Sequence, residues 1–376
     1  MSLQALVSER KLIVCVGSGG VGKTTTAASL ALRAALQGRR VLVLTIDPAR
    51  RLANSLGLES FGNTEVRIDL GARPGAGELW AAMLDAPSTL RDVIARVARD
   101  AATRDAIYAN RIFQNIAGSF SGSQEYMATE RLHDVYTSGR FDLIVLDTPP
   151  VKNALDFLES PGRLARFLDR QIMKWFLTPE EEDKMFGKRL MLGTSAVVNR
   201  LLGHIFGKEF LKELSSFFTL FRDLYDGMRA RHEAVGRIFG DDATTFVVVS
   251  APTEPSVDVA TFFLEELASR KLPTGAIVVN QVHRCSATVP DVETLLGSAA
   301  RAIDPVTAPI LLARLGAAHR RLRALAALEQ GWIARLRASA PRLPFIEVPR
   351  LPGEVHDLTG LLDLHADLFA SRPSLL

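Results

Sequence analysis

A glycine-rich turn between an apolar run and a helical segment constrains the fold of this chain more than any other feature. The apolar run covers residues 12–16, and the helical segment runs from Thr24 to Gln37 before it stops at Gly38. Between them the sequence GSGGVGKT, which begins at Gly17, fills the spacing G-x-x-x-x-G-K-[ST]. The pattern predicts a strand, an anion-binding loop and a helix in direct succession.

A loop of this kind binds phosphate through its backbone and two of its side chains. Glycines let the chain fold tightly around an anion and point several N–H groups at it, and the start of the helix adds partial positive charge. We expect Lys23 to reach the β- and γ-phosphates and the Thr24 hydroxyl to bind Mg²⁺. The alternative is a glycine-rich turn that binds nothing.

Length, charge and cysteine content limit the class of protein. The 376 residues suffice for one large α/β domain with insertions or for two domains, and a formal net charge of +3 gives no reason to expect a nucleic-acid partner. Cys15 and Cys285 are the only cysteines, so neither a disulfide framework nor a zinc site is expected. Without a signal-like start or a run long enough to span a membrane, the sequence predicts a cytoplasmic protein with no transmembrane segment.

Near-continuous apolar runs predict a parallel sheet. Because they do not alternate with polar residues, the strands should be buried on both faces and flanked by helices. We therefore predict a doubly wound, mostly parallel α/β fold that binds its ligand at the carboxyl ends of the strands. Besides the first run, the strand-like segments are residues 41–47, 65–70, 79–84, 141–147, 245–250, 276–280 and 343–348.

Two helical stretches interrupt this alternation. A phenylalanine-rich stretch divides the chain into a first core part, 1–159, an insertion, 160–240, and a second core part, 241–376. Its phenylalanines either form an ordinary core or line a groove for a hydrophobic helix. The second stretch, an arginine-rich segment near 300–340, predicts one amphipathic helix or a pair of helices. Its arginines form either a solvated face or a surface for a membrane or an acidic partner.

Acidic residues end two of the predicted strands. Asp47 lies in TIDPAR, where its carboxylate could orient an attacking water or hold Mg²⁺ through one; the alternative is a strand-end residue that caps the next helix. Asp147 follows four apolar residues in LIVLD, the pattern that aims a carboxylate at the metal of a nucleotide. Asn280 ends another strand, and its amide suits an adenine edge, although a loop-capping role also explains it.

Together these motifs resemble those of the arsenical-pump and tail-anchored-protein-targeting ATPases, relatives of the septum-positioning and plasmid-partition ATPases. The resemblance rests on GGVGKTTT in the loop, DPA after the second strand, DTPP from Asp147 and NQ at Asn280. It covers most of the chain, including SGSQEYM at 121–127 and VPRLPGEV at 348–355, and it is weakest in the insertion.

The resemblance implies a Mg²⁺-dependent ATPase of P-loop fold, with ATP or ADP as its ligand and Thr24, Asp47 and Asp147 around the metal. It implies that Asp47 positions the hydrolytic water and that Lys23 contacts the reacting phosphates. The residues implied to bind phosphate are Gly17, Ser18, Gly19, Gly20, Val21, Gly22, Lys23, Thr24 and Thr25. Those implied to contact adenine are Asn280, Pro349, Leu351 and Pro352.

The resemblance also implies a homodimer, or a heterodimer with a paralogous ATPase, whose nucleotide state moves a helical region that binds a protein partner or a hydrophobic helix. Ser18 departs from the family, which usually has a lysine there that reaches the partner's phosphates. Without that lysine, either hydrolysis is slow in a homodimer, or another group supplies the missing positive charge. That group could belong to a paralogous partner, or it could be Arg50 or Arg51. The alternative function is an ATP-binding scaffold or positioning protein with little hydrolysis unless it is paired with a lysine-bearing paralogue.

Two further departures concern cysteine. The zinc-binding pair of the targeting members is missing, so no zinc is expected and dimerisation has to rest on packing. The arsenic-binding cysteines are also missing, which argues against an arsenite pump.

Overall fold

The computed structural model describes most of the chain outside the predicted insertion. The described residues are 2–47, 51–56, 63–71, 73, 75–111, 113–114, 123–149, 213, 216, 230–285, 307–351, 353, 355 and 357–369. The phenylalanine-rich segment between 150 and 229 therefore lies outside the described residues, apart from 213 and 216.

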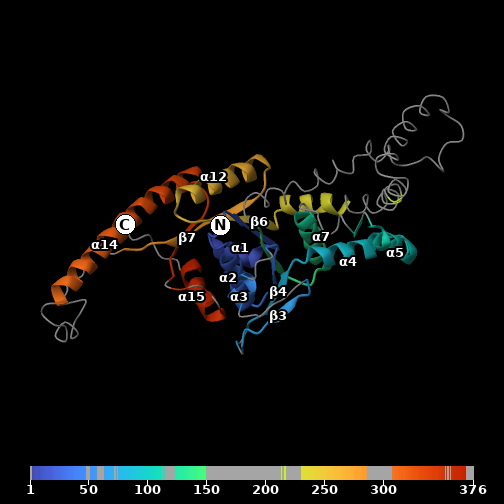
Figure 1. Ribbon diagram of the computed structural model, residues 1–376, viewed down its shortest axis with the longest axis horizontal. Helices are drawn as coiled ribbons and strands as arrows, with labels where there is room; N and C mark the ends of the chain where they lie inside the picture. The colour runs from blue at the N-terminus through green and yellow to red at the C-terminus, as the bar shows by residue number, and fades with distance from the viewer. Residues whose placement is uncertain are drawn as a thin grey trace, which may run out of the picture.

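An eight-stranded sheet forms the centre of the described structure, in the order β3-β4-β2-β5-β1-β6-β7-β8 (Figure 1). All neighbouring strands are parallel except β3 and β4, which run antiparallel. This confirms the doubly wound, mostly parallel fold. The strands are β1 (Leu12–Gly17), β2 (Arg40–Thr45), β3 (Val66–Ile68), β4 (Glu78–Met83), β5 (Leu143–Asp147), β6 (Thr244–Ser250), β7 (Thr274–Val282) and β8 (Phe345–Pro349).

One predicted strand end differs in a way that matters for the site. The second strand stops at Thr45, not at Asp47, because the chain turns there and the Asp47 N–H donates to the Thr45 hydroxyl at 3.3 Å. Asp47 therefore lies in the loop beyond the strand, where its side chain is not confined by the sheet.

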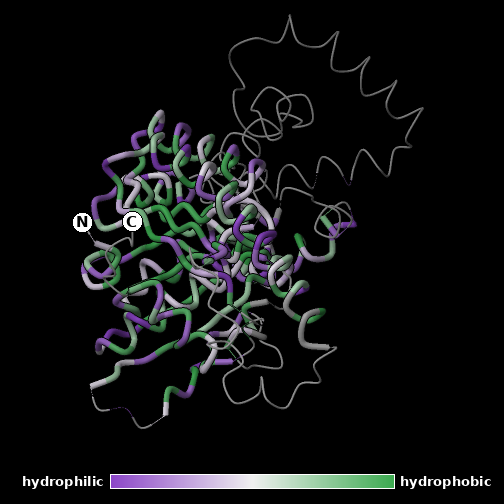
Figure 2. The backbone as a smooth tube through the Cα atoms, turned by 90° about the vertical axis from the view of Figure 1, so that its left-hand side faces the viewer, coloured by the Kyte–Doolittle hydropathy of each residue, from purple (hydrophilic) through white to green (hydrophobic). Residues whose placement is uncertain are grey.

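Helices cover both faces of the sheet. The helices are α1 (Leu3–Glu9), α2 (Lys23–Leu36), α3 (Arg51–Ser55), α4 (Ala86–Val97), α5 (Ala101–Ala109), α7 (Ser123–Ser138), α12 (Glu254–Ser269), α14 (Thr307–Ser339) and α15 (Leu358–Phe369). Alternate residues of β1 face opposite ways: Val14 packs with α7 and α12, and Ile13 packs with α1, α2 and α15. The apolar strands form the middle layer, which is the greenest part of Figure 2.

The helical residues 230–240 pack on the sheet rather than standing apart from it. Val235 and Phe239 are buried, and the Phe239 ring lies 5.9 Å from the ring of Phe246 on β6. Arg231 holds this segment to α7 through the buried Glu130, at 2.5 Å. The last residues of the stretch assigned to the insertion therefore contribute to the main core.

The arginine-rich segment forms a single helix, α14, of 33 residues. Its C-terminal third packs on α12, with Ile333 and Leu336 buried, while its N-terminal part projects from the body of the molecule (Figure 1). None of the helices in the described ranges is both long and apolar enough to cross a membrane.

Candidate functional site

The predicted phosphate-binding loop lies at the carboxyl end of β1, between β5 and β6. Gly17 pairs with Val249 of β6, and a Cβ at Gly17 would lie 2.0 Å from the Val249 carbonyl oxygen. With φ at +156° as well, only glycine fits where the loop leaves the sheet. The motif's first glycine is thus required by packing between the strands, before any ligand is considered.

The loop closes onto the start of α2. Gly22 has a left-handed φ of +90° and precedes Lys23, the first residue of the helix. The Lys23 ammonium folds back over the loop and donates to the Ser18 carbonyl at 2.8 Å. The cation is therefore held across the loop, with the helix N–H groups beneath it, as anion binding requires.

Asp147 lies beside this cation at the end of β5, completely buried. Its Oδ2 accepts hydrogen bonds from the Thr24 hydroxyl at 2.7 Å and the Thr45 hydroxyl at 2.9 Å. Its Oδ1 is buried and has no hydrogen-bond partner among the described residues. A buried carboxylate oxygen without a partner is costly, and a hydrated divalent ion would satisfy it. Thr24 and Asp147 therefore fit Mg²⁺.

Burial raises the pKa of Asp147 from 3.8 to about 6, although the two threonine donors and the Lys23 charge oppose the shift. Asp47 adds to the rise in pKa, which shows that its charge acts on Asp147. The cluster therefore holds two carboxylates and one ammonium. A second positive charge, such as a metal ion, would favour the ionised form of Asp147.

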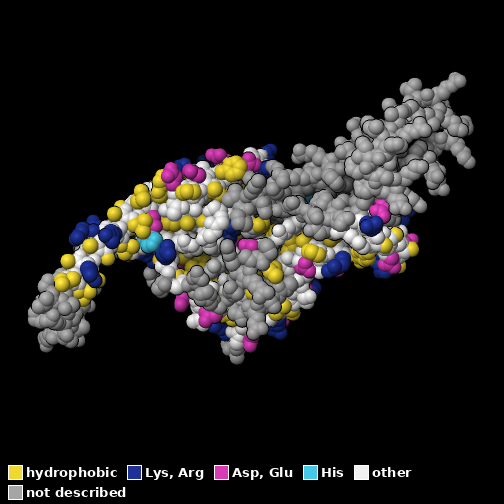
Figure 3. Space-filling view, in the orientation of Figure 1, with side chains coloured by type: hydrophobic (Ala, Val, Ile, Leu, Met, Phe, Trp, Pro, Cys, Tyr) yellow, Lys and Arg dark blue, Asp and Glu magenta, His cyan; other side chains and the backbone are white. Residues whose placement is uncertain are grey.

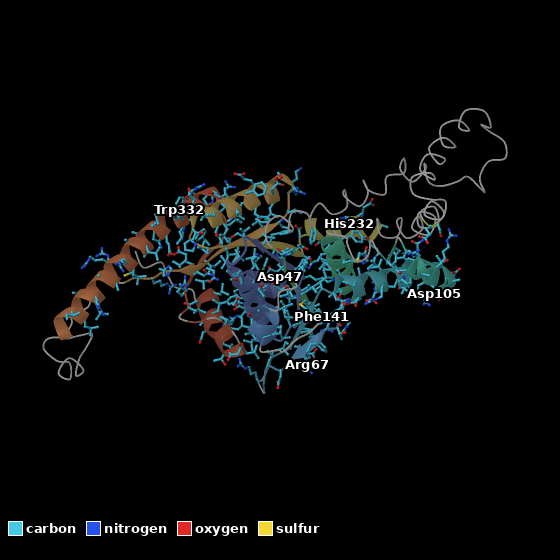
Figure 4. The ribbon with its side chains drawn as sticks, in the orientation of Figure 1. Asp47, Arg67, Asp105, Phe141, His232 and Trp332 are labelled. Carbon is cyan, nitrogen blue, oxygen red and sulfur yellow. The ribbon has the colours of Figure 1, made fainter. Side chains whose placement is uncertain are left out.

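Asp47 lies near the centre of the molecule (Figure 4), in the loop after β2. The loop is tied at both ends: the Ile46 N–H donates to the Asp147 carbonyl at 3.0 Å, and Gln124 of α7 donates to the Ile46 carbonyl, also at 3.0 Å. The Asp47 carboxylate is thus placed at the edge where β1, β2 and β5 end.

The end of β7 holds the loop from the other side. The Asn280 amide donates to the Val21 carbonyl, and the Gln281 amide donates to the Gly20 carbonyl, both at 3.0 Å. The approach is close, because a Cβ at Gly22 would lie 2.2 Å from the Asn280 nitrogen. Gln281 has a φ of +64°, unusual for a residue with a side chain, at a break in the pairing of β7 with β8.

The segment implied to contact adenine lies next to this strand end. Pro349 ends β8 opposite Val282, and the Arg350 N–H donates to the Val282 carbonyl at 2.9 Å. Leu351 follows, partly exposed, and Pro352 lies outside the described residues. The structure therefore brings Asn280 and Pro349 to one corner of the sheet, beside the loop.

Ser18, where the family usually has lysine, is linked to α12. Its hydroxyl lies 3.3 Å from the hydroxyl of Ser256, which in turn lies 3.0 Å from that of Thr253. Of the two arginines considered as a replacement for the lysine, Arg50 and the side chain of Arg51 lie outside what the structure describes. Gly19 and Gly20 are exposed at the tip of the loop, Val21 is buried beneath it, and Thr25 is partly exposed on α2.

Sequence analysis missed several side chains that shape the site. Thr45 lies two residues before Asp47, and an alternating strand places its hydroxyl beside Asp147; its position in the motif TID could have indicated this. Gln281 follows Asn280 directly, but no sequence pattern marks its unusual φ. Ser256 and Gln124 come from helices distant in sequence, so only the tertiary fold reveals them.

Comparison with known proteins identifies the family of this chain. A family model described as anion-transporting ATPase matches residues 10–290. The ATPase GET3 of Podospora anserina is 29% identical over 284 residues, covering 75% of this chain and 76% of the relative. The ATPase get3 of Aspergillus terreus is 30% identical over 288 residues, with the same two coverages. The family expected from the motifs is confirmed, and this chain belongs to the anion-transporting ATPase family.

Proposed function

We propose that the chain binds Mg²⁺ and ATP at the loop between β1 and α2 and hydrolyses the γ-phosphate. The observation that carries this proposal is the buried Asp147 with one oxygen unpaired, next to the Thr24 hydroxyl and the Lys23 ammonium. Family membership and the names of the relatives, which are ATPases, support it.

In this proposal the loop binds and orients the triphosphate. The backbone N–H groups of residues 19–25 and the Lys23 ammonium bind the phosphate oxygens. Thr24 and Asp147 would hold the metal, with the Asp147 carboxylate accepting the hydrogen bond of the Thr24 hydroxyl. When bound, Mg²⁺ neutralises charge on the phosphates and aligns them for attack. Asn280, Pro349, Leu351 and Pro352 are proposed to receive the adenine.

Asp47 is proposed to act on the attacking water. It lies in a loop rather than in the strand, close enough to Asp147 to affect its pKa, and it is partly exposed. A carboxylate there can accept a proton from water or fix the water's orientation in line with the γ-phosphate. Asp47 is also proposed to contact the metal's outer shell.

We also propose that the ATPase is a dimeric switch that couples nucleotide state to the binding of a protein partner or a hydrophobic helix. Family resemblance supports the dimer, as a homodimer or with a paralogue, and is the reason to propose the insertion, 160–240, as the partner's site. Residues 160–229 of the insertion lie outside the described residues, apart from 213 and 216, and the phenylalanine spacing together with the family supports the proposal there.

A second candidate function is an ATP-binding scaffold that scarcely hydrolyses its ligand. Ser18 favours it, because its hydroxyl is bonded to Ser256 and carries no positive charge for a transition state. Steady-state phosphate release by the purified protein separates the two functions. Slow but measurable release by the chain alone supports the switch, and no release by the chain alone supports the scaffold.

A further inference from the structure

The N-terminal part of α14 is an exposed helix with an apolar stripe. From residue 310 to residue 328 no described side chain is buried. Several large apolar side chains are exposed there: Ile310 by 54%, Leu315 by 42%, Leu325 by 40% and Leu328 by 60%. Figure 3 shows this projecting end as hydrophobic and basic side chains, with no acidic side chain on the face in view.

The stripe has a seven-residue repeat. Leu315, Leu322, Glu329 and Leu336 form one row at this spacing, and Leu311, Ala318, Leu325 and Trp332 form the other. Two such rows are the a and d positions of a coiled coil, the narrow seam along which two helices pack. We call residues 311, 315, 318, 322 and 325 the α14 seam.

The same stripe already packs on the protein at its C-terminal end. Leu336 is buried against the core, and the one acidic member of the rows, Glu329, is buried and bonded to the His283 side chain at 2.6 Å. Its second oxygen accepts from the His283 N–H at 2.8 Å. The stripe is therefore built for helix packing, and the α14 seam continues it beyond α12 with apolar residues only.

The charges around the seam indicate the partner's chemistry. Residues 307–328 contain four arginines, Arg314, Arg320, Arg321 and Arg323, and no aspartate or glutamate. Arg314 and Arg321 immediately precede the seam residues Leu315 and Leu322, which places them at the g positions that set partner choice. A second copy of this segment would offer these arginines no carboxylate: in an antiparallel pair they would face each other, and in a parallel pair they would face His319 and Ala326.

A membrane surface fits less well. A helix that lies on lipid confines its charges to the side away from the bilayer. Here the exposed Ile310 and Leu328 lie on the same side of the helix as the arginines, so apolar and charged side chains are not separated in this way. The family match ends at residue 290, so this helix lies outside the matched part of the chain.

We propose that the projecting half of α14 is a docking surface for an acidic α-helix of a partner protein. The partner's apolar residues pack on the α14 seam, and its carboxylates pair with Arg314 and Arg321. The proposal is independent of nucleotide binding, because the seam lies on the part of α14 that projects from the body of the molecule (Figure 1).

The test uses the full chain and two labelled four-heptad peptides, with leucine at a and d and either glutamate or lysine at e and g. Fluorescence anisotropy should show saturable binding of the glutamate peptide alone. Arg314→Glu with Arg321→Glu should weaken it by about tenfold or more and allow the lysine peptide to bind. Arg320→Glu with Arg323→Glu makes the same change in net charge on the far side and should alter binding by less than about threefold.

A second pair of variants tests the apolar contact separately. Leu315→Ser should weaken binding of the glutamate peptide, whereas Ile310→Ser, at a residue of similar exposure outside the seam, should not. Both sites are exposed, so the far-ultraviolet circular dichroism and melting temperature should stay unchanged.

Four results would overturn the proposal. They are no binding of the glutamate peptide, equal losses from the two double arginine variants, Leu315-dependent binding to phosphatidylglycerol vesicles without peptide binding, and a dimer in light scattering that Leu315→Ser dissociates. The last two results would assign the seam to lipid and to a second copy of the chain, respectively.

Discussion

The loop between β1 and α2 holds one buried ammonium, whereas the projecting half of α14 carries four arginines, and the two regions hold these charges in opposite ways. Lys23 is buried and bonded to the loop's own backbone, and two strands and a helix fix the residues around it. The arginines of α14 stand on a helix with no buried side chain among its described residues from 310 to 328.

This difference indicates how each region achieves specificity for its ligand or partner. At the loop, packing fixes the geometry before a ligand arrives, so small changes in single residues should have large effects on binding and turnover. On α14 the surface is exposed to solvent and screened by salt, so single charges should have small effects and only grouped changes should be visible. The following predictions use this contrast.

The largest effect is expected from Lys23→Ala. Removing the ammonium should weaken ATP binding by about 100-fold or more, because the loop loses the charge that pairs with the phosphates. Equilibrium binding of a fluorescent ATP analogue measures this loss of affinity. Lys11→Ala serves as the control, since Lys11 lies at the opposite end of β1 and contacts the Tyr136 ring. Near-equal binding by wild type and Lys23→Ala would remove the loop from the mechanism.

Asp47→Asn should slow turnover while leaving binding intact. The amide cannot accept the proton of the attacking water, so kcat should fall by about 100-fold, whereas the Kd for ATP should change by less than about threefold. Phosphate release and the binding assay together measure the two quantities. Asp142→Asn is the matched control, because Asp142 pairs with Arg40 at the amino ends of β5 and β2, opposite the strand ends that carry the site. A wild-type rate for Asp47→Asn would exclude the proposed role.

In the absence of metal, Asp147→Asn should change how the free energy of unfolding depends on pH. The pKa of Asp147 is raised from 3.8 to about 6. The contribution of this carboxyl to the free energy of unfolding is therefore fully present below about pH 4 and is lost as pH rises through about 6. The variant should therefore be more stable than wild type at pH 7.5 by up to about 3 kcal/mol, and the gap should close towards pH 4. Urea unfolding in EDTA measures it.

The comparison of the two proteins isolates Asp147 from other titrating groups. Burial lowers the pKa of His232 to about 4, so its contribution is lost as pH falls, the opposite direction, and it is present in both proteins. Adding Mg²⁺ at pH 7.5 should stabilise wild type and leave Asp147→Asn unchanged. A pH-independent difference would show that Asp147 does not titrate in this range.

The smallest effect is expected from Gln281→Ala. One hydrogen bond to the Gly20 carbonyl is lost, which should weaken ATP binding by about three- to tenfold and leave kcat nearly unchanged. Lys271→Ala is the control, because Lys271 is the other described non-glycine residue with positive φ and lies away from the loop. Equal losses in both variants would attribute the effect to backbone strain and not to the contact.

Residues 12–24 and 143–147 show what sequence can predict. The glycine spacing and the unbroken apolar runs each favour one local structure. The strand, the loop and the acidic residue at the strand end therefore lie where the motifs predict them. The family followed from the order of these motifs. Thr45, which also donates to Asp147, was not predicted, although its place two residues before Asp47 could have indicated it.

The rest of the site depends on contacts between distant segments. Asn280 is predicted to contact adenine, and the structure shows its amide donating to the Val21 carbonyl. The two residues are far apart in the sequence, so no local pattern predicts this contact. The same holds for the link between Ser18 and Ser256. On α14 the spacing predicted helix but left open one helix or two, and the structure shows one continuous helix, Thr307–Ser339.

The most direct test is isothermal titration of the purified chain with ATP in the presence and absence of Mg²⁺. The account predicts a saturable heat of binding that requires Mg²⁺ for full affinity and disappears in Lys23→Ala. A wild-type protein that is folded by circular dichroism and shows no heat with Mg²⁺ and ATP would contradict it.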